Sequence, residues 1–150
     1  MKLIKQISLC VIVVGAGILF IPIGASACTC DLPFPVKTVK QQVVEARKQS
    51  KAVFSGEVVE VIADPQIAYV EVKFRVEKYW KGVLTNEVTV VTGRGSGDCG
   101  YRFEVGAHYL VFAYGAGKKF GTNICQRTKG LAEAAEDLKL LGKGKPLTSL

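Results

Sequence analysis

Four of the five cysteines constrain the fold of this 150-residue chain more than any other feature. Cys28 and Cys30 flank one threonine in "ASACTCDLP", and Cys99 and Cys125 follow much later. Four cysteines allow three pairings. A Cys28–Cys30 bond would close a strained ring, because it holds the two Cα atoms at an awkward separation. We therefore expect bonds to distant cysteines, each stabilising the fold by about 4–5 kcal/mol in the chain-entropy model.

The first 27 residues have the pattern of a secretory signal peptide. Two lysines precede an almost wholly apolar run over 7–24, and the triplet Ala-Ser-Ala at 25–27 is a small-residue cleavage site. Cleavage after the triplet would remove Cys10, make Cys28 the first residue and lower the formal net charge from +7 to +5. We therefore expect an exported protein, secreted or periplasmic, in a compartment that favours disulfides. The length of the apolar run leaves an uncleaved membrane anchor as an alternative.

The rest of the chain is predicted to form one domain over 28–142, followed by a frayed tail at 143–150. "DLPFP" at 31–35 predicts a stiff extended arm, because proline fixes φ and extends its neighbour. An amphipathic helix is predicted over 36–50. Its apolar stripe consists of Val36, Val39, Val43, Val44 and Ala46.

Five segments that are rich in β-branched or alternating apolar residues predict strands. They cover 52–63, 68–80, 87–92, 109–114 and 120–126, with Gly56 as a candidate bulge and Cys125 inside the last strand. A second amphipathic helix is predicted over 131–141, with Leu131, Ala135, Leu138 and Leu141 facing inward. These elements predict a mostly-β fold, a five-stranded oligonucleotide/oligosaccharide-binding (OB) barrel with one helix at each end of the chain, since a closed barrel has no exposed edges.

The C-x-C pair has two chemical interpretations. Reduced thiolates would suit a soft metal ion, but export favours disulfides for all four cysteines. Alternatively, a mature terminus at Cys28 would carry an α-amino group that is partly neutral at physiological pH. That amine and the carbonyl of the same residue form a five-membered chelate for a metal ion, although an ordinary processed terminus has the same sequence.

The remaining motifs indicate neither an enzyme nor a cofactor. His108 is the single histidine, and paired cysteines cannot act as nucleophiles. "GRGSGDCG" at 93–100 lacks the G-K-[ST] of a phosphate loop and is read as a connector for Cys99. One strand face is aromatic and basic, with Tyr69, Lys73, Arg75, Tyr79 and Lys81. It also carries Glu71 and Glu77, which repel phosphate, so a solvated face is favoured over a nucleic-acid site.

Five segments resemble the N-terminal, netrin-like domain of the tissue inhibitors of metalloproteinases. "CTCDLPFP" resembles that family's C-x-C-x-x-P-x-P start, and "YWKG" at 79–82 the end of a family strand. "DCG" at 98–100 is similar to the family's Cys-Gly. "YLVFAYG" at 109–115 and "TNICQ" at 122–126 resemble its last two strands and the cysteine there. The resemblance covers nearly all of 28–141 and suggests a minimal, bacterial-type relative.

The resemblance implies a fold, a disulfide pairing and an activity. It implies an OB barrel with disulfides Cys28–Cys99 and Cys30–Cys125, and a monomer that inhibits a zinc metalloendopeptidase. The amine and carbonyl of Cys28 would ligate the enzyme's zinc, and Thr29 would enter the specificity pocket. The inhibitory ridge would consist of Cys28, Thr29, Cys30, Asp31 and Leu32, with Asp98, Cys99 and Gly100 as a second contact loop.

The chain also departs from that family. The third disulfide of the family's barrel domain is missing, Leu32 replaces a common proline, and Phe34 replaces a common histidine. A protein-binding or structural module of the cell envelope is therefore an alternative function. "ASAC" is also a weak lipobox, and lipid on Cys28 would consume its thiol, block its amine and anchor the protein to a membrane.

Overall fold

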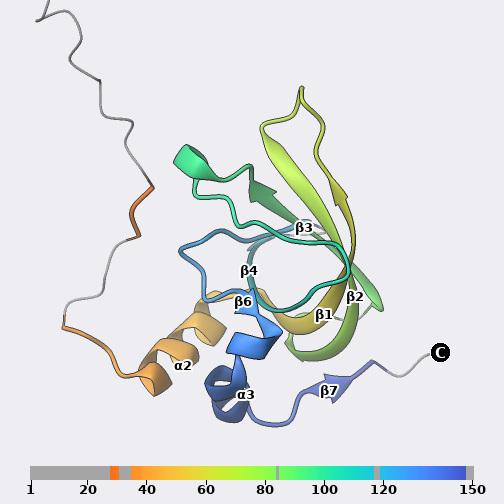
Figure 1. The fold of residues 1–150 in the computed structure, drawn as a ribbon. Coiled ribbons are helices and arrows are strands. Elements are labelled where there is room, and N and C mark those ends of the chain that lie inside the picture. Colours follow the sequence, from red (N-terminus) through yellow and green to blue (C-terminus); the bar gives the residue numbers. More distant parts are fainter. Residues whose placement is uncertain (1–27, 31–34, 84, 117–118, 148–150) are drawn as a thin grey trace, which may run out of the picture.

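A closed five-stranded β-barrel with two helices forms the described part of the chain (Figure 1). This computed structural model describes residues 28–30, 35–83, 85–116 and 119–147. The predicted signal peptide at 1–27 and residues 31–34 of the predicted arm lie outside the described residues. Among the residues that are described, no helix is both long and apolar enough to cross a membrane. The fold confirms the predicted mostly-β barrel with flanking helices.

The barrel closes because its first strand pairs with strands on both sides. β1 (Ala52–Ile62) pairs antiparallel with β2 (Tyr69–Lys81) and with β4 (His108–Ala116). β3 (Glu87–Gly93) continues from β2 and pairs in parallel with β5 (Lys119–Gly121), which returns antiparallel to β4. The predicted kink at Gly56 is confirmed by a register shift between Ser55 and Gly56. A Cβ at Gly56 would lie 2.4 Å from the Arg75 carbonyl oxygen, so the two strands approach there as only glycine allows.

The barrel interior is an aromatic and valine core. Phe74 makes edge-to-face contacts with Phe54, Phe103 and Tyr109, at centroid distances of 5.4, 5.2 and 6.4 Å. Val72, Phe74 and Val76 are buried, as the alternation of that strand predicts. Burial on one strand face therefore orients β2 and its neighbours around a single core.

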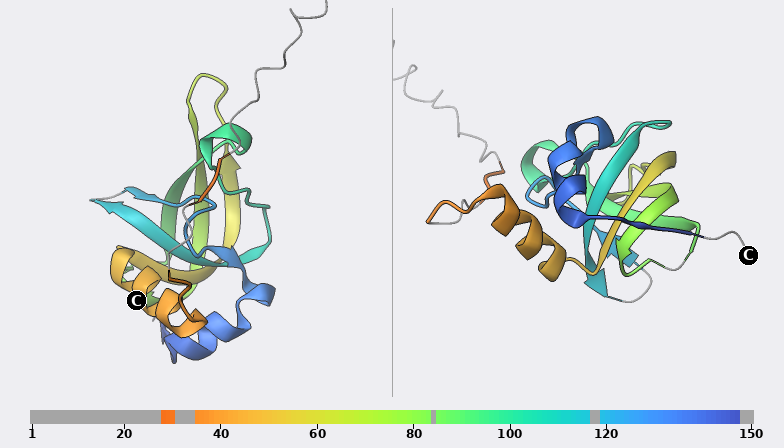
Figure 2. Two further views of the ribbon diagram at one scale, coloured as in Figure 1. Left: turned by 90° about the vertical axis from the view of Figure 1, so that its left-hand side faces the viewer. Right: turned by 90° about the horizontal axis from the view of Figure 1, so that it is seen from below.

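A second core lies between the outside of the barrel and the helices α2 (Val39–Gln49) and α3 (Ala135–Leu141). Its buried members are Val43, Val53, Leu110, Phe112, Ala134 and Leu141. Both helices lie at the opposite end of the barrel from the β1–β2 hairpin and the short 3-10 helix η2 (Ser96–Asp98) (Figures 1 and 2).

The first helix begins three residues later than predicted, because Thr38 caps it. The Thr38 hydroxyl accepts a hydrogen bond from the Gln41 amide at 3.3 Å, and the Gln41 side chain accepts one from the Thr38 amide at 2.9 Å. Val36 therefore lies outside the helix, 89% exposed, and Val44 is 60% exposed. Only Val43 of the predicted stripe is buried, while Val39 and Ala46 pack at its edge.

The predicted strand 120–126 is wrong beyond Gly121. β5 ends there, and Cys125 lies in a turn. The Asn123 side chain explains the turn, because its oxygen accepts hydrogen bonds from the amides of Cys125 and Gln126 at 2.9 and 3.1 Å. A local side-chain bond of this kind competes with strand pairing.

The predicted helix 131–141 is divided in two. The 3-10 helix η3 (Leu131–Glu133) is followed by α3, and Ala134 is fully buried at the junction, while Ala135 is exposed rather than inward. Two further short strands are β6 (Lys129–Gly130), on β4, and β7 (Lys145–Pro146), on β2. The predicted frayed tail is thus wrong at 145–146, where it pairs with the barrel, and 148–150 lies outside the described residues.

Candidate functional site

Two disulfides attach the segment 28–30 to the barrel. Cys28 is bonded to Cys99 and Cys30 to Cys125, each with a Cα–Cα distance of 5.3 Å. This is the pairing that the family resemblance implies. The sulfur atoms of Cys28, Cys99 and Cys125 lie within 4.8 Å of one another, so the two bonds are neighbours. Because these sulfurs are bonded in pairs, the structure favours the disulfide interpretation of the C-x-C pair over a thiolate metal site.

The loop that carries Cys99 is organised by one carboxylate. Asp98 accepts hydrogen bonds from the backbone amides of Arg94, Gly95 and Gly100, at 2.6, 2.9 and 3.0 Å. These bonds, the one from the Arg94 amide first, lower the pKa of Asp98 below its ordinary value. Asp98 therefore acts inside the loop, as its internal brace.

Backbone geometry explains the glycine after Cys99. Cys99 has a left-handed backbone with φ of 59°, and the chain then passes directly against Gly93. A Cβ at Gly100 would lie 2.2 Å from the carbonyl carbon and oxygen of Gly93. A larger residue would push this part of the loop away from the barrel and displace Cys99.

The loop that carries Cys125 is closed at its base by two buried hydroxyls. Thr122 and Thr128 are hydrogen-bonded to each other at 2.8 Å, and the Phe112 amide donates to Thr128 at 3.0 Å. The Thr122 hydroxyl also donates to the Phe112 carbonyl at 3.1 Å. Further along, the Ile124 amide donates to the Cys99 carbonyl at 2.9 Å, which joins the two cysteine loops directly.

A buried ion pair connects the Cys125 loop to both helices. The Arg127 guanidinium donates two hydrogen bonds to Asp137, at 2.6 and 3.0 Å, and one to the Gln42 side chain at 2.7 Å. Asp137 is 2% exposed and also faces Lys129 at 3.3 Å. The loop that anchors Cys30 is therefore braced by α2 and α3 as well as by β4.

Arg94 connects the Cys99 loop to the β1–β2 hairpin. Its guanidinium donates to the carbonyl of Ile67, at 2.6 Å from one nitrogen and 3.1 Å from another, and to the carbonyl of Asp64. The hairpin and η2 consequently lie at the same end of the barrel (Figure 2, left). The candidate site is thus a platform made from four chain segments: 28–30, 94–100, 122–128 and the hairpin turn.

The structure brings together the predicted ridge residues that it describes and the predicted contact loop. Thr29 is exposed between the two bonded cysteines. Ile124, 46% exposed, is an apolar residue of the platform that the sequence did not single out. Its position next to Cys125 could have pointed to it, but the sequence predicted a strand for that segment. Asp31 and Leu32 lie outside the described residues.

The other candidates from the sequence lie away from this platform. His108 contacts the Glu77 carboxylate through Nδ1 at 3.0 Å. On the outer face of β2, Lys73 pairs with Glu60 at 2.6 Å and Arg75 with Glu57 at 2.7 Å. Carboxylates therefore neutralise the basic strand face, which supports its interpretation as a solvated surface.

No protein-family model and no curated protein matches this chain.

Proposed function

We propose that the mature protein is an exported inhibitor of a zinc metalloendopeptidase, similar to the tissue inhibitors of metalloproteinases. Cleavage after Ala27 would leave Cys28 with a free amine. That amine and the Cys28 carbonyl would ligate the zinc of the enzyme, and Thr29 would enter the adjacent specificity pocket. Asp31 and Leu32 would continue the ridge, and Asp98, Cys99 and Gly100 would form the second contact.

The observation that carries this proposal is the exposed Thr29 held between two disulfide-bonded cysteines. A chain end is normally free to move, and fixing it on binding costs conformational entropy. Here both neighbours of Thr29 are bonded to loops that are themselves braced by Asp98 and by the Arg127–Asp137 pair. Most of that cost is therefore met during folding, which favours tight binding.

The chemistry of the target explains why such a terminus inhibits. A zinc protease uses a metal-bound water as its nucleophile, with a pKa lowered to near neutral. An amine nitrogen and a carbonyl oxygen that ligate the same zinc displace this water and leave no nucleophile. The inhibitor itself needs no catalytic residue and no cofactor.

Two measurements on the exported protein test the proposal. Intact-mass analysis should give a chain that starts at Cys28, carries no adduct, and gains four hydrogens on reduction. A start at another residue, or a lipid adduct on Cys28, would refute the free-amine mechanism.

The second measurement is inhibition of a panel of zinc metalloproteinases by the mature protein and by a variant with one alanine before Cys28. The extra residue turns the amine into an amide, which is a poor zinc ligand, so we expect at least a hundredfold loss of potency. Equal potency of the two proteins would exclude chelation by the amine.

The alternative is a protein-binding or structural module of the cell envelope without inhibitory activity, either with or without a lipid anchor on Cys28. The Cys28–Cys99 disulfide disfavours a lipid anchor, because it uses the Cys28 thiol that lipidation requires. The intact mass identifies the lipid-anchored form, since a diacylglycerol adduct and a disulfide at Cys28 are mutually exclusive, and the protease panel separates an inhibitor from a module without lipid.

A further inference from the structure

A pocket on the outer surface of the barrel has no part in the proposed inhibitory ridge. It has a volume of about 430 Å³, within the range of small-molecule sites. Its walls come from β1, β2, η3 and α3, through Ser55, Glu77, Lys78, Trp80, Leu131 and Leu138. None of these residues belongs to the platform formed by 28–30, 94–100, 122–128 and the hairpin turn.

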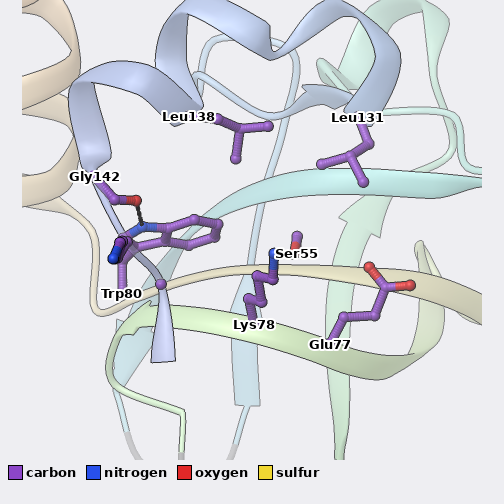
Figure 3. A pocket seen from close by; sticks show the side chains of 9 residues that line it. Ser55, Glu77, Lys78, Trp80, Leu131, Leu138 and Gly142 are labelled. Atoms are coloured by element: carbon purple, nitrogen blue, oxygen red, sulfur yellow. Dashed lines mark hydrogen bonds between the residues drawn. The ribbon is translucent and has the colours of Figure 1, made fainter. Parts of the chain in front are cut away.

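The apolar part of the pocket is an indole with two leucines. Trp80 closes one end, and Leu131 and Leu138 lie on the side opposite Lys78 and Glu77 (Figure 3). The Trp80 indole nitrogen donates to the Gly142 carbonyl at 2.8 Å, which fixes the ring. A Cβ at Gly144 would lie 2.9 Å from the indole ring, so the segment before β7 packs directly against it. The aromatic wall is therefore rigid and already formed.

The polar side chains of the pocket carry more positive than negative charge, with two lysines and one glutamate. Ser55 is 3% exposed and lines the pocket. Lys78 and Lys143 also line the pocket, and neither forms an ion pair with a described residue. The lining also includes the Glu77 carboxylate, which contacts His108 Nδ1 at 3.0 Å, so two ammonium groups stand against one carboxylate. The excess positive charge and the Ser55 hydroxyl thus favour a ligand that brings one negative charge of its own.

We propose that this pocket binds a small monocarboxylate with an apolar body, such as an arylalkyl acid. The body would lie against Trp80 and the two leucines. The carboxylate would accept hydrogen bonds from Ser55 and Lys78. Charge-assisted bonds of this kind are the stronger ones, and they select an acid over an uncharged molecule of the same shape.

Trp80 is the single tryptophan of the chain, so its fluorescence reports on this pocket alone. Titration of the mature protein with 4-phenylbutyrate should give a saturable change in emission. Lys78→Ala should weaken binding at least tenfold, since it removes a charge-assisted hydrogen bond to the carboxylate. Lys40→Ala, on the exposed part of α2, is the matched control and should bind as the parent does.

Ser55→Ala tests the hydroxyl without adding bulk and should also weaken binding. The uncharged analogue 4-phenyl-1-butanol separates recognition of the acid from apolar contact. An absent or unsaturable response to 4-phenylbutyrate, equal binding of the acid and the alcohol, or unchanged binding by Lys78→Ala would overturn the proposal. Amide chemical shifts, followed in the same titration, should move around Trp80 and Leu138. Neither titration measures protease inhibition, so the pocket proposal can fail while the inhibitory proposal stands.

Discussion

Removing one disulfide at a time tests how the ridge is anchored. The two bonds span 71 and 95 residues, and taken alone either would stabilise the fold by about 4.5 kcal/mol in the chain-entropy model. Their ends are neighbours in the chain, however, so one bond shortens the loop that the other closes. With Cys28–Cys99 intact, the path from Cys30 to Cys125 runs across that bond and covers only about 30 residues.

The double variant Cys30→Ala/Cys125→Ala should therefore lose about 3.6 kcal/mol of unfolding free energy. Cys28→Ala/Cys99→Ala opens a loop of the same length and should lose about as much. Removing both bonds should cost about 8 kcal/mol, more than the two single losses together, because no cross-link then remains. That loss equals the whole stability of many small domains, so the protein without disulfides should be largely unfolded.

The assay is urea unfolding of the oxidised mature protein, followed by tryptophan fluorescence. The slope with urea should rise in each variant, because an unfolded chain with fewer cross-links exposes more surface. Ile124→Ala is the control: it lies in the same loop, is 46% exposed and should change stability by less than about 1 kcal/mol. Two results would refute the argument that each bond shortens the loop of the other. One is a difference of more than about 2 kcal/mol between the unfolding free energies lost in the two single-disulfide deletions. The other is a protein without either disulfide that is as stable as one that keeps a single disulfide.

Three further perturbations test the braces of the platform. Asp137→Ala should lower the unfolding free energy by about 3 kcal/mol in chemical unfolding, because it removes the carboxylate partner of the partly buried Arg127 guanidinium. The exposed neighbour variant Glu136→Ala should stay within about 0.5 kcal/mol of the parent. Gly100→Ala should lower the unfolding free energy by about 1–3 kcal/mol, because its Cβ would clash with the Gly93 backbone. Gly97→Ala has open space around it and should leave the unfolding free energy nearly unchanged in the same experiment. The lowered pKa of Asp98 means that its hydrogen bonds are fully present above the ordinary aspartate range and are lost as the pH falls through the folded value. The protection of the Gly100 amide against hydrogen exchange, measured relative to the intrinsic rate at each pH, should therefore fall in acid more than that of barrel amides, and an equal response would contradict this role.

Elements determined by local patterns could be predicted from the sequence. The alternation over 69–76 predicted the buried face of β2, and the β-branched runs predicted the barrel strands. The division of the second helix around Ala134 could not be predicted in this way, because burial against the barrel rather than periodicity decides it. The pairing of β7 with β2 likewise depends on contacts between segments far apart in the chain.

The candidate site likewise combines features that local patterns predict with contacts that they do not predict. The C-x-C pair and "DCG" are local motifs, and through the family resemblance they led to the four cysteines that the structure joins. The hydrogen bond from Arg127 to Gln42 joins residues that are 85 positions apart, and no sequence pattern around either residue predicts it. The turn at Asn123 was missed for a different reason: its neighbours have strand propensity, and one side-chain hydrogen-bond acceptor outweighs it.

The central claim is that the Cys28 amine and carbonyl bind the zinc of a target enzyme. The most direct test uses a metalloproteinase that the mature protein inhibits, with cobalt(II) in place of zinc, because the visible spectrum of cobalt(II) depends on its ligands. We predict that binding of the protein beginning at Cys28 changes this spectrum, and that the variant with one added alanine leaves it unchanged. Inhibition with no spectral change, or the same change with both proteins, would contradict the claim.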